Sequence, residues 1–146
     1  MKAILPRGGL IAEGAYLLPV RVYYEDTDAA GVVYYANYLK FMERARTEWL
    51  EALGFPLAAV EREHGVVFVV HRCEIDFHLP ARLNDALHVS VEPVKVGATT
   101  LKARQQVCRG GDTLTSALVT LACLDAARWR PVRMPANIAA KMENPA

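Results

Sequence analysis

The sequence has no excess of charge of either sign and no long apolar run. Its 17 basic and 16 acidic side chains leave a formal net charge of +1, whereas a general nucleic-acid binder normally carries a marked basic excess. No apolar stretch approaches the roughly 20 residues that a membrane-spanning helix needs. We therefore expect neither a nucleic-acid partner nor a transmembrane segment.

The sequence also lacks paired cysteines. Cys73, Cys108 and Cys123 are odd in number and widely spaced, and no two of them form a CxxC pair. This spacing predicts neither a disulfide framework nor a zinc site. The simplest expectation is a reducing, cytoplasmic setting in which all three thiols pack on strands.

Motifs of several enzyme classes are absent as well. There is no GxSxG elbow, phosphate loop or dinucleotide fingerprint, and the four histidines lack the spacing of an HExxH metal site. Asp26, Asp28 and Gly31 have the spacing that opens a calcium-binding loop. However, Ala30 and Asn37 stand at two positions where such a loop needs oxygen ligands. These patterns predict no bound metal.

Length and composition favour one compact domain over residues 1–146. The chain has 146 residues, of which 53% are hydrophobic, enough to bury a core. We find no internal repeat. Residues 1–15 are expected to form a loose leader, because Pro6 and the Gly8–Gly9 pair interrupt a stretch too short for a signal peptide.

The apolar periodicity predicts one long helix among several strands. From Asn37 apolar residues recur at helical spacing as far as Gly54, which supplies a stop. The class is therefore α+β, with an antiparallel sheet of about five strands in hairpin order. The expected strands are Leu17–Glu25, Val66–Phe77, Ala86–Val96, Thr99–Arg109 and Thr113–Leu124, and a short helix is expected at Pro135–Met142.

The expected helix is too small to cover such a sheet. One helix shields only part of one face, so the other face or an edge needs a partner. A second copy of the chain is the simplest partner, and we expect at least a homodimer. Thr113–Leu124 carries apolar side chains at both parities, which predicts a central strand with both faces covered.

The segment from Tyr24 to Tyr38 holds the residues suited to chemistry. It places two carboxylates, a glycine and several tyrosines between a predicted strand and the predicted helix. A carboxylate beside a helix N-terminus, where backbone N–H groups can bind an oxyanion, suits acyl transfer or hydrolysis. Asp28 is the better candidate, whereas Asp26 is expected to hydrogen-bond a turn backbone. Gly31 is expected to adopt positive φ and to let a ligand approach the backbone.

The same segment resembles a known family. The pattern is Tyr24-x-Asp26-Thr27-Asp28-x-x-Gly31-Val32-Val33-Tyr34-x-x-Asn37-Tyr38-x-x-Phe41-x-Glu43-x-x-Arg46. It is similar to that of the hot-dog-fold acyl-CoA thioesterases, especially the 4-hydroxybenzoyl-CoA thioesterase branch and its Tol–Pal-associated YbgC enzymes. The resemblance implies one long helix wrapped by an antiparallel sheet and assembly into homodimers or homotetramers. It also implies hydrolysis of acyl-coenzyme A thioesters with no metal and no cofactor.

The resemblance assigns roles to single positions. It places the catalytic aspartate on Asp28, as nucleophile or general base, and an oxyanion-binding backbone N–H near Tyr35. Tyrosines of this motif also suit a plain role as core or interface aromatics. Substrate contacts are expected from the motif and from one strand residue, namely Tyr24, Gly31, Val32, Val33, Asn37, Tyr38 and Phe68.

One position departs from the YbgC pattern. Many YbgC-type enzymes have a catalytic histidine where this chain has Tyr35, and a neutral phenol cannot replace imidazole as a base at neutral pH. The 4-hydroxybenzoyl-CoA branch has tyrosine there and relies on its aspartate, so we expect activity to survive. Two alternatives stay open: a hydratase of the same fold, and a non-catalytic acyl-CoA-binding or envelope-associated scaffold protein.

Overall fold

The computed structural model describes residues 3–4, 9–12 and 14–144. Within them, strands form one antiparallel sheet in the order β1-β2-β3-β5-β6-β7-β4. The strands are β1 (Ala3–Ile4), β2 (Leu10–Ala12), β3 (Ala15–Arg21), β4 (Val66–Phe77), β5 (Ala86–Val96), β6 (Thr100–Arg109) and β7 (Asp112–Asp125). The helices are α1 (Asn37–Ala52), α2 (Leu57–His64) and α3 (Ala136–Glu143), and Tyr24–Asp26 forms a 3-10 helix.

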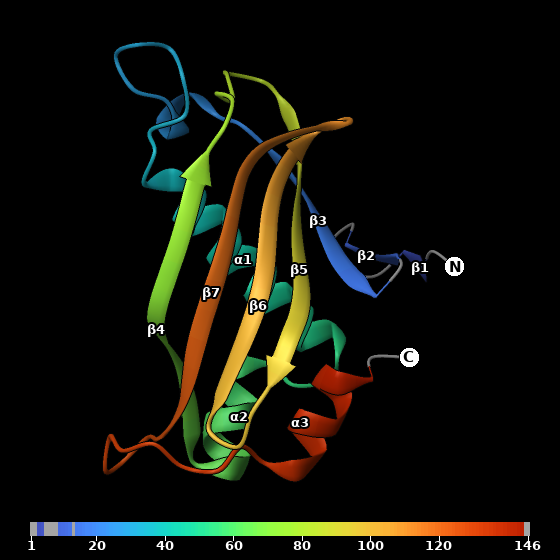
Figure 1. The fold of residues 1–146 in the computed structure, drawn as a ribbon, viewed down its shortest axis with the longest axis vertical. Helices are drawn as coiled ribbons and strands as arrows, with labels where there is room; N and C mark the ends of the chain where they lie inside the picture. Colours follow the sequence, from blue (N-terminus) through green and yellow to red (C-terminus); the bar gives the residue numbers. More distant parts are fainter. Residues whose placement is uncertain (1–2, 5–8, 13, 145–146) are drawn as a thin grey trace.

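The long helix α1 lies across one face of the sheet (Figure 1) and packs on β3, β5 and β6. Removing its apolar side chains from water is the main force that holds the two layers together. The α+β class and the long helix expected from the sequence are confirmed. The apolar side chains that α1 buries are Tyr38, Phe41, Met42, Ala45, Trp49 and Leu50.

The N-terminal part of the chain differs from the expected loose leader. Ala3–Ile4 and Leu10–Ala12 are strands that extend the sheet beyond β3, so the sheet of the described residues has seven strands where about five were expected. The other residues of the expected leader with uncertain placement, 1–2, 5–8 and 13, lie outside the described residues.

Two further local features differ from what the sequence predicted. The strand expected over Leu17–Glu25 ends at Arg21, because the chain turns into the 3-10 helix that the Asp26 carboxylate stabilises. No helix was predicted over Leu57–His64, which forms α2. This helix has only one buried residue, Val60, so it lacks the apolar period that marks a helix.

The C-terminal strands agree with expectation. β4 and β5 have the predicted bounds, β6 begins one residue later than expected, and β7 extends one residue further at each end. β7 is an interior strand between β6 and β4, but it lies next to the sheet edge and not at the predicted centre. No described helix covers the sheet face opposite α1 (Figure 1), and Leu118 and Ala122 are only partly buried. β4 is an edge strand of the described sheet.

Three connecting segments gather at one end of the molecule, the top in Figure 1. They are the segment between β3 and α1, the turn between β6 and β7, and residues 78–85, which we call the β4–β5 connection. The fold thus brings the predicted catalytic segment next to loops that are distant in sequence.

Candidate active site

Residues 27–33 form a small turn that carries Asp28. Thr27 pairs with Val33, and the Asp28 N–H donates to the Val32 carbonyl at 2.9 Å. The Gly31 N–H donates to the Asp28 carbonyl at 3.0 Å. Gly31 has φ of +80°, a region that favours glycine, so its expected conformation is confirmed.

The Asp28 carboxylate is exposed, and one of its two oxygens accepts a hydrogen bond. Its Oδ1 accepts the Ala30 N–H at 2.8 Å, whereas Oδ2 accepts no hydrogen bond from the described residues. The side chain borders a hollow of about 550 Å³, the aspartate hollow, which Tyr24, Gly31 and Leu83 also line. One carboxylate oxygen therefore fixes the turn, and the other is available to a ligand or a water molecule.

Asp26 has a different environment. Its side chain is 6% exposed; Oδ2 accepts the Tyr23 N–H at 2.9 Å and Oδ1 accepts the Asn37 side-chain amide at 3.0 Å. The expected hydrogen bond to a turn backbone is confirmed. Asn37 was expected to contact substrate, but its buried amide ties the first residue of α1 to this turn.

The N-terminus of α1 offers an unused donor. Among the residues that the structure describes, no side chain caps this helix. The Tyr34 N–H donates to the Asp26 carbonyl at 2.9 Å, and the Asn37 N–H donates to the Tyr34 carbonyl at 2.8 Å. The Tyr35 N–H between them donates to no acceptor among the described residues. An unpaired N–H at the positive end of a helix dipole is suited to bind an oxyanion.

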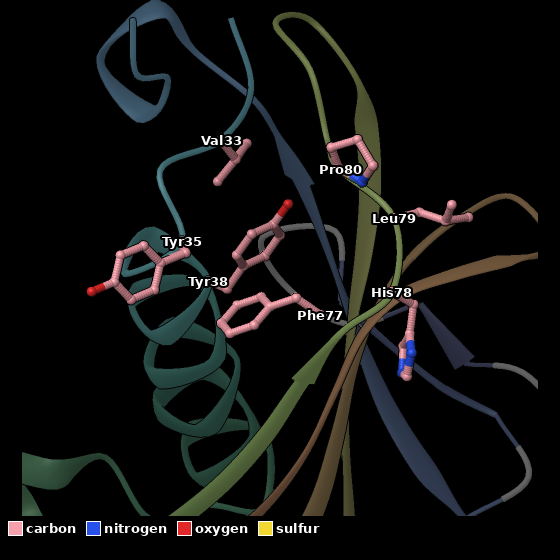
Figure 2. A pocket seen from close by; sticks show the side chains of 7 residues that line it. All are labelled: Val33, Tyr35, Tyr38, Phe77, His78, Leu79 and Pro80. Carbon is pink, nitrogen blue, oxygen red and sulfur yellow. The ribbon is translucent and has the colours of Figure 1, made fainter. Parts of the chain in front are cut away.

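A second hollow, the aromatic hollow, lies beside this helix end. It measures about 250 Å³ and is lined largely by apolar side chains. Figure 2 shows Tyr38 and Phe77 between α1 and the β4–β5 connection, with the Tyr35 ring directed away from that connection. The ring centroid of Phe77 lies 5.7 Å from that of Tyr38 and 6.0 Å from that of Tyr35. The lining residues are Val33, Tyr35, Tyr38, Phe77, His78, Leu79 and Pro80.

The β4–β5 connection contributes to both hollows, and sequence reasoning missed it. Leu79 and Pro80 line the aromatic hollow and Leu83 lines the aspartate hollow. Leu79 and Leu83 are exposed apolar residues in a loop, a signal of binding that the sequence offered. Their positions beside the two hollows, however, depend on tertiary contacts.

The predicted site residues do not all meet within one chain. Tyr24 and Gly31 border the aspartate hollow, while Val33 and Tyr38 border the aromatic hollow. Val32 pairs with Arg82 of the β4–β5 connection. Phe68 instead lines a separate hollow of about 90 Å³ with Glu43, Arg46 and Leu50 of α1.

The three cysteines lie on β4, β6 and β7 and are free thiols, as expected. Burial raises the pKa of the Cys73 thiol and of the Cys123 thiol. Neither is therefore prepared to act as a thiolate nucleophile at neutral pH.

Two further properties concern the described part of the chain as a whole. Within it, no three His, Cys, Asp or Glu side chains gather in a way that could hold a metal ion. No helix among these residues combines the length and apolarity required to cross a bilayer.

Known proteins resemble this chain in sequence over most of its length. An acyl-CoA thioesterase YbgC from Haemophilus influenzae is 42% identical over 128 residues, which is 88% of this chain and 94% of that protein. A 1,4-dihydroxy-2-naphthoyl-CoA hydrolase from Nostoc punctiforme is 31% identical over 84% of this chain and 82% of its own length.

A solved structure extends the likeness to the fold. A probable thioesterase from Bartonella henselae superimposes with a TM-score of 0.80 at 32% identity, covering 83% of this chain and 99% of that one. The match confirms the hot-dog fold implied by the motif. The model of the thioesterase-like superfamily matches residues 22–142, and the chain belongs to that superfamily.

Proposed function

We propose that the chain is an acyl-CoA thioesterase, which hydrolyses an acyl-coenzyme A to a free acid and coenzyme A. One observation carries the proposal: Asp28, with one carboxylate oxygen available, lies in the turn that leads to a helix start whose Tyr35 N–H has no acceptor in the described structure. A base or nucleophile near an oxyanion donor is the minimum equipment for this hydrolysis. The names of the relatives agree with it.

The reaction can take two routes from this geometry. As a general base, Asp28 removes a proton from water while the water oxygen bonds to the thioester carbon. As a nucleophile, Asp28 bonds to that carbon itself, and water then hydrolyses the resulting anhydride. In both routes the Tyr35 N–H binds the oxyanion, the C–S bond breaks, and the coenzyme A sulfur leaves and is protonated. Water and the thioester are the only reactants.

The exposed Tyr35 ring has a secondary part in this scheme. It is 62% exposed and forms an edge-to-face contact with Phe77, so it belongs to the wall of the aromatic hollow. We assign the acyl group to that hollow because its walls are mostly apolar. The backbone role of position 35 does not depend on the side chain.

We further propose that the active unit is a homodimer formed along β4. The outer edge of β4 is unpaired in the described sheet, and Val70 and Phe77 on it are about half exposed. Antiparallel pairing of two β4 strands about their midpoint would put residue 68 of one copy opposite residue 75 of the other. This explains why Phe68 is separated from the other predicted substrate contacts in a single chain.

The face on which Phe68 lies supports this arrangement. The β4–β7 register shifts between Val70 and Arg72, so Phe68 before the shift and Phe77 after it share one face of the sheet. The partner's Phe68 would therefore approach the aromatic hollow from the correct side. Further assembly into a homotetramer remains a prediction.

We also propose a cytoplasmic location, which the free thiols and the acyl-CoA substrate class support. The Tol–Pal link implied by the family resemblance remains a prediction.

The proposed function is tested by release of free thiol from a panel of acyl-CoAs with short aliphatic, long aliphatic and aromatic acyl groups. Wild type should turn over at least one member, and Asp28→Asn should reduce kcat by roughly 100-fold or more, because it keeps the size and removes the charge. Glu25→Gln, an exposed carboxylate change in the same segment, is the matched control and should leave kcat unchanged.

Two outcomes would contradict the proposal in different ways. Full turnover by Asp28→Asn would exclude Asp28 as base and nucleophile. Acyl-CoA binding without turnover by wild type would favour the non-catalytic binding or scaffold role.

A further inference from the structure

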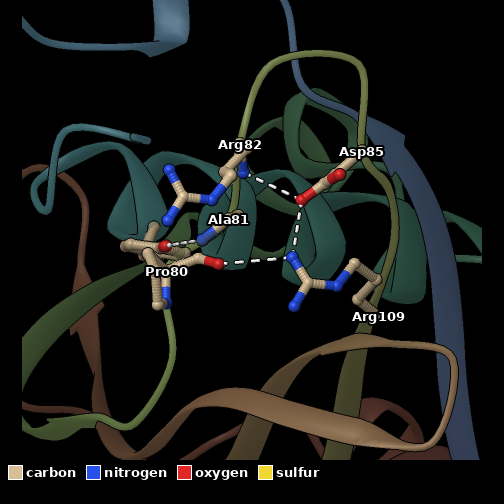
Figure 3. A network of polar contacts seen from close by, with 6 residues as sticks. Pro80, Ala81, Arg82, Asp85 and Arg109 are labelled. Carbon is tan, nitrogen blue, oxygen red and sulfur yellow. Dashed lines mark hydrogen bonds and ion pairs between the residues drawn. The ribbon is translucent and has the colours of Figure 1, made fainter. Parts of the chain in front are cut away.

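One arginine that lines neither hollow is hydrogen-bonded to the β4–β5 connection (Figure 3). Nη1 of Arg109, the last residue of β6, donates to Asp85 Oδ2 at 2.8 Å and to the Pro80 carbonyl at 3.3 Å. The same Asp85 oxygen accepts the Arg82 N–H at 2.8 Å. One guanidinium and one carboxylate therefore fix three points of a single loop.

The other side of the same loop contacts the proposed site. Ala81 is fully buried; its N–H donates to the Tyr38 hydroxyl at 3.0 Å, and its carbonyl accepts the Val33 N–H at 2.8 Å. Val32 forms an antiparallel bridge with Arg82. A continuous series of hydrogen bonds thus joins Arg109 to the Asp28 turn and to the first turn of α1.

The Asp85–Arg109 pair is built to persist at neutral pH. Burial opposes ionisation of Asp85, but the hydrogen bonds from the Arg82 N–H and the Arg109 side chain outweigh it, so the pKa of Asp85 lies below its ordinary value. The side chains are 23% and 35% exposed, so this pair is less screened by solvent than an ordinary surface pair.

We propose that Arg109 and Asp85 are positioning residues for thioester hydrolysis. They fix the conformation of the β4–β5 connection. Through its hydrogen bonds, Ala81 of that connection then holds Val33 and Tyr38 in place, which precede and follow Tyr35 in the sequence. Neither Arg109 nor Asp85 lines the aspartate hollow or the aromatic hollow, so they act through the backbone and not on the substrate. The inference rests on the proposed function, because it concerns the geometry of that reaction.

The test compares kcat and KM of Arg109→Ala, Asp85→Asn, their double variant and Arg109→Lys. Since a small misplacement of reacting groups costs up to about 100-fold in rate, Arg109→Ala should lower kcat by roughly 10- to 100-fold and change KM much less. The double variant should be no worse than the poorer single variant, because both remove one linkage. Arg109→Lys, which keeps the charge and one donor, should recover part of the loss.

The matched control is Arg104→Ala on the same strand. Arg104 pairs with Glu92 at 3.8 Å, and both side chains are about half exposed. This variant should keep wild-type kcat. An Arg109→Ala enzyme that keeps kcat, as the control does, or changes only KM would overturn the proposal.

Amide hydrogen exchange gives a readout that does not need turnover. In Arg109→Ala and Asp85→Asn the Ala81 and Val33 amides should exchange faster than in wild type, while amides in the middle of α1 should not. Unchanged exchange at both amides would overturn the linkage even if kcat fell. If wild type has no thioesterase activity, the proposed function fails, whereas exchange still decides whether Arg109 orders the connection.

Discussion

Asp26 and Asp28 lie two positions apart and have opposite surroundings. Asp26 is buried and accepts two hydrogen bonds, from the Tyr23 N–H and the Asn37 side chain. Asp28 is exposed and keeps one oxygen available. Asp26 therefore stabilises the turn, because its buried carboxylate accepts two hydrogen bonds. Asp28 is available for catalysis, because its exposed carboxylate can contact a substrate.

Replacing Asp26 with alanine should lower the free energy of unfolding by about 1–3 kcal/mol, since it leaves the buried Asn37 amide without its acceptor. Urea unfolding followed by circular dichroism measures this change. Asp28→Asn, in the exposed position, should stay within about 0.5 kcal/mol of wild type. Equal unfolding midpoints for Asp26→Ala and wild type would contradict the structural role of Asp26.

The elements of the fold differ in how well the sequence predicts them. The bounds of α1, β4 and β5 follow from apolar period and turn residues, which are local properties. α2 was not predicted, because it buries a single side chain and so shows no apolar periodicity. The β4–β5 connection was not predicted because its hydrogen bonds to Val33 and Tyr38 join residues more than 40 positions apart, and no local pattern encodes such contacts.

The same contrast applies to the site. The sequence alone predicted Asp28 as the catalytic candidate, positive φ at Gly31 and a helix that starts at Asn37, since these residues lie within one short segment. It could not place Leu79, Pro80 and Leu83 beside them. It also could not reveal that the Asn37 side chain is already engaged by Asp26, because that contact depends on how the turn folds back on the helix.

The β4–β5 connection makes stability depend on pH through Asp85. Arg82 and Arg109 face its carboxylate and depress its folded-state pKa. Its contribution is therefore fully present above the ordinary unfolded-state pKa near ~3.9 and is lost as pH falls through the lower folded-state pKa. The difference in unfolding free energy between wild type and Asp85→Asn should be constant from about pH 7 to 5 and shrink below about pH 4.

Urea midpoints across that pH range measure this difference. The Arg109→Ala background is the control: without the arginine, Asp85→Asn should cost less at neutral pH, and its pH dependence should weaken. A difference that grows toward low pH would contradict the assigned direction.

The described part of the molecule has one long sheet edge without a partner strand. β4 has 12 residues, and a long unpaired edge with exposed apolar side chains invites pairing with another chain. The register shift near His71 keeps Phe68 and Phe77 on the face that carries α1. A shared β4 edge would thus both continue the sheet and complete each aromatic hollow.

Light scattering after size-exclusion chromatography should give a wild-type mass of at least twice the 16.1 kDa of one chain. Val70→Lys places a charge on the edge of β4, where Val70 is 50% exposed, and should shift the protein toward monomer with loss of turnover. Val94→Lys, a similarly exposed valine on β5, should remain a dimer. A monomeric wild type with full activity would contradict the proposed assembly.

Asp26 and Asn37 hold the backbone of the turn and helix start, whereas the Tyr35 ring does not, and this difference affects how such a protein can evolve. Within the described residues, the ring at position 35 contributes to the structure through its edge contacts with Tyr34 and Phe77. Selection can therefore exchange that ring, including for an imidazole, while the fold and the backbone donor persist. Position 35 is a site where new reactivity can be explored at small cost in stability.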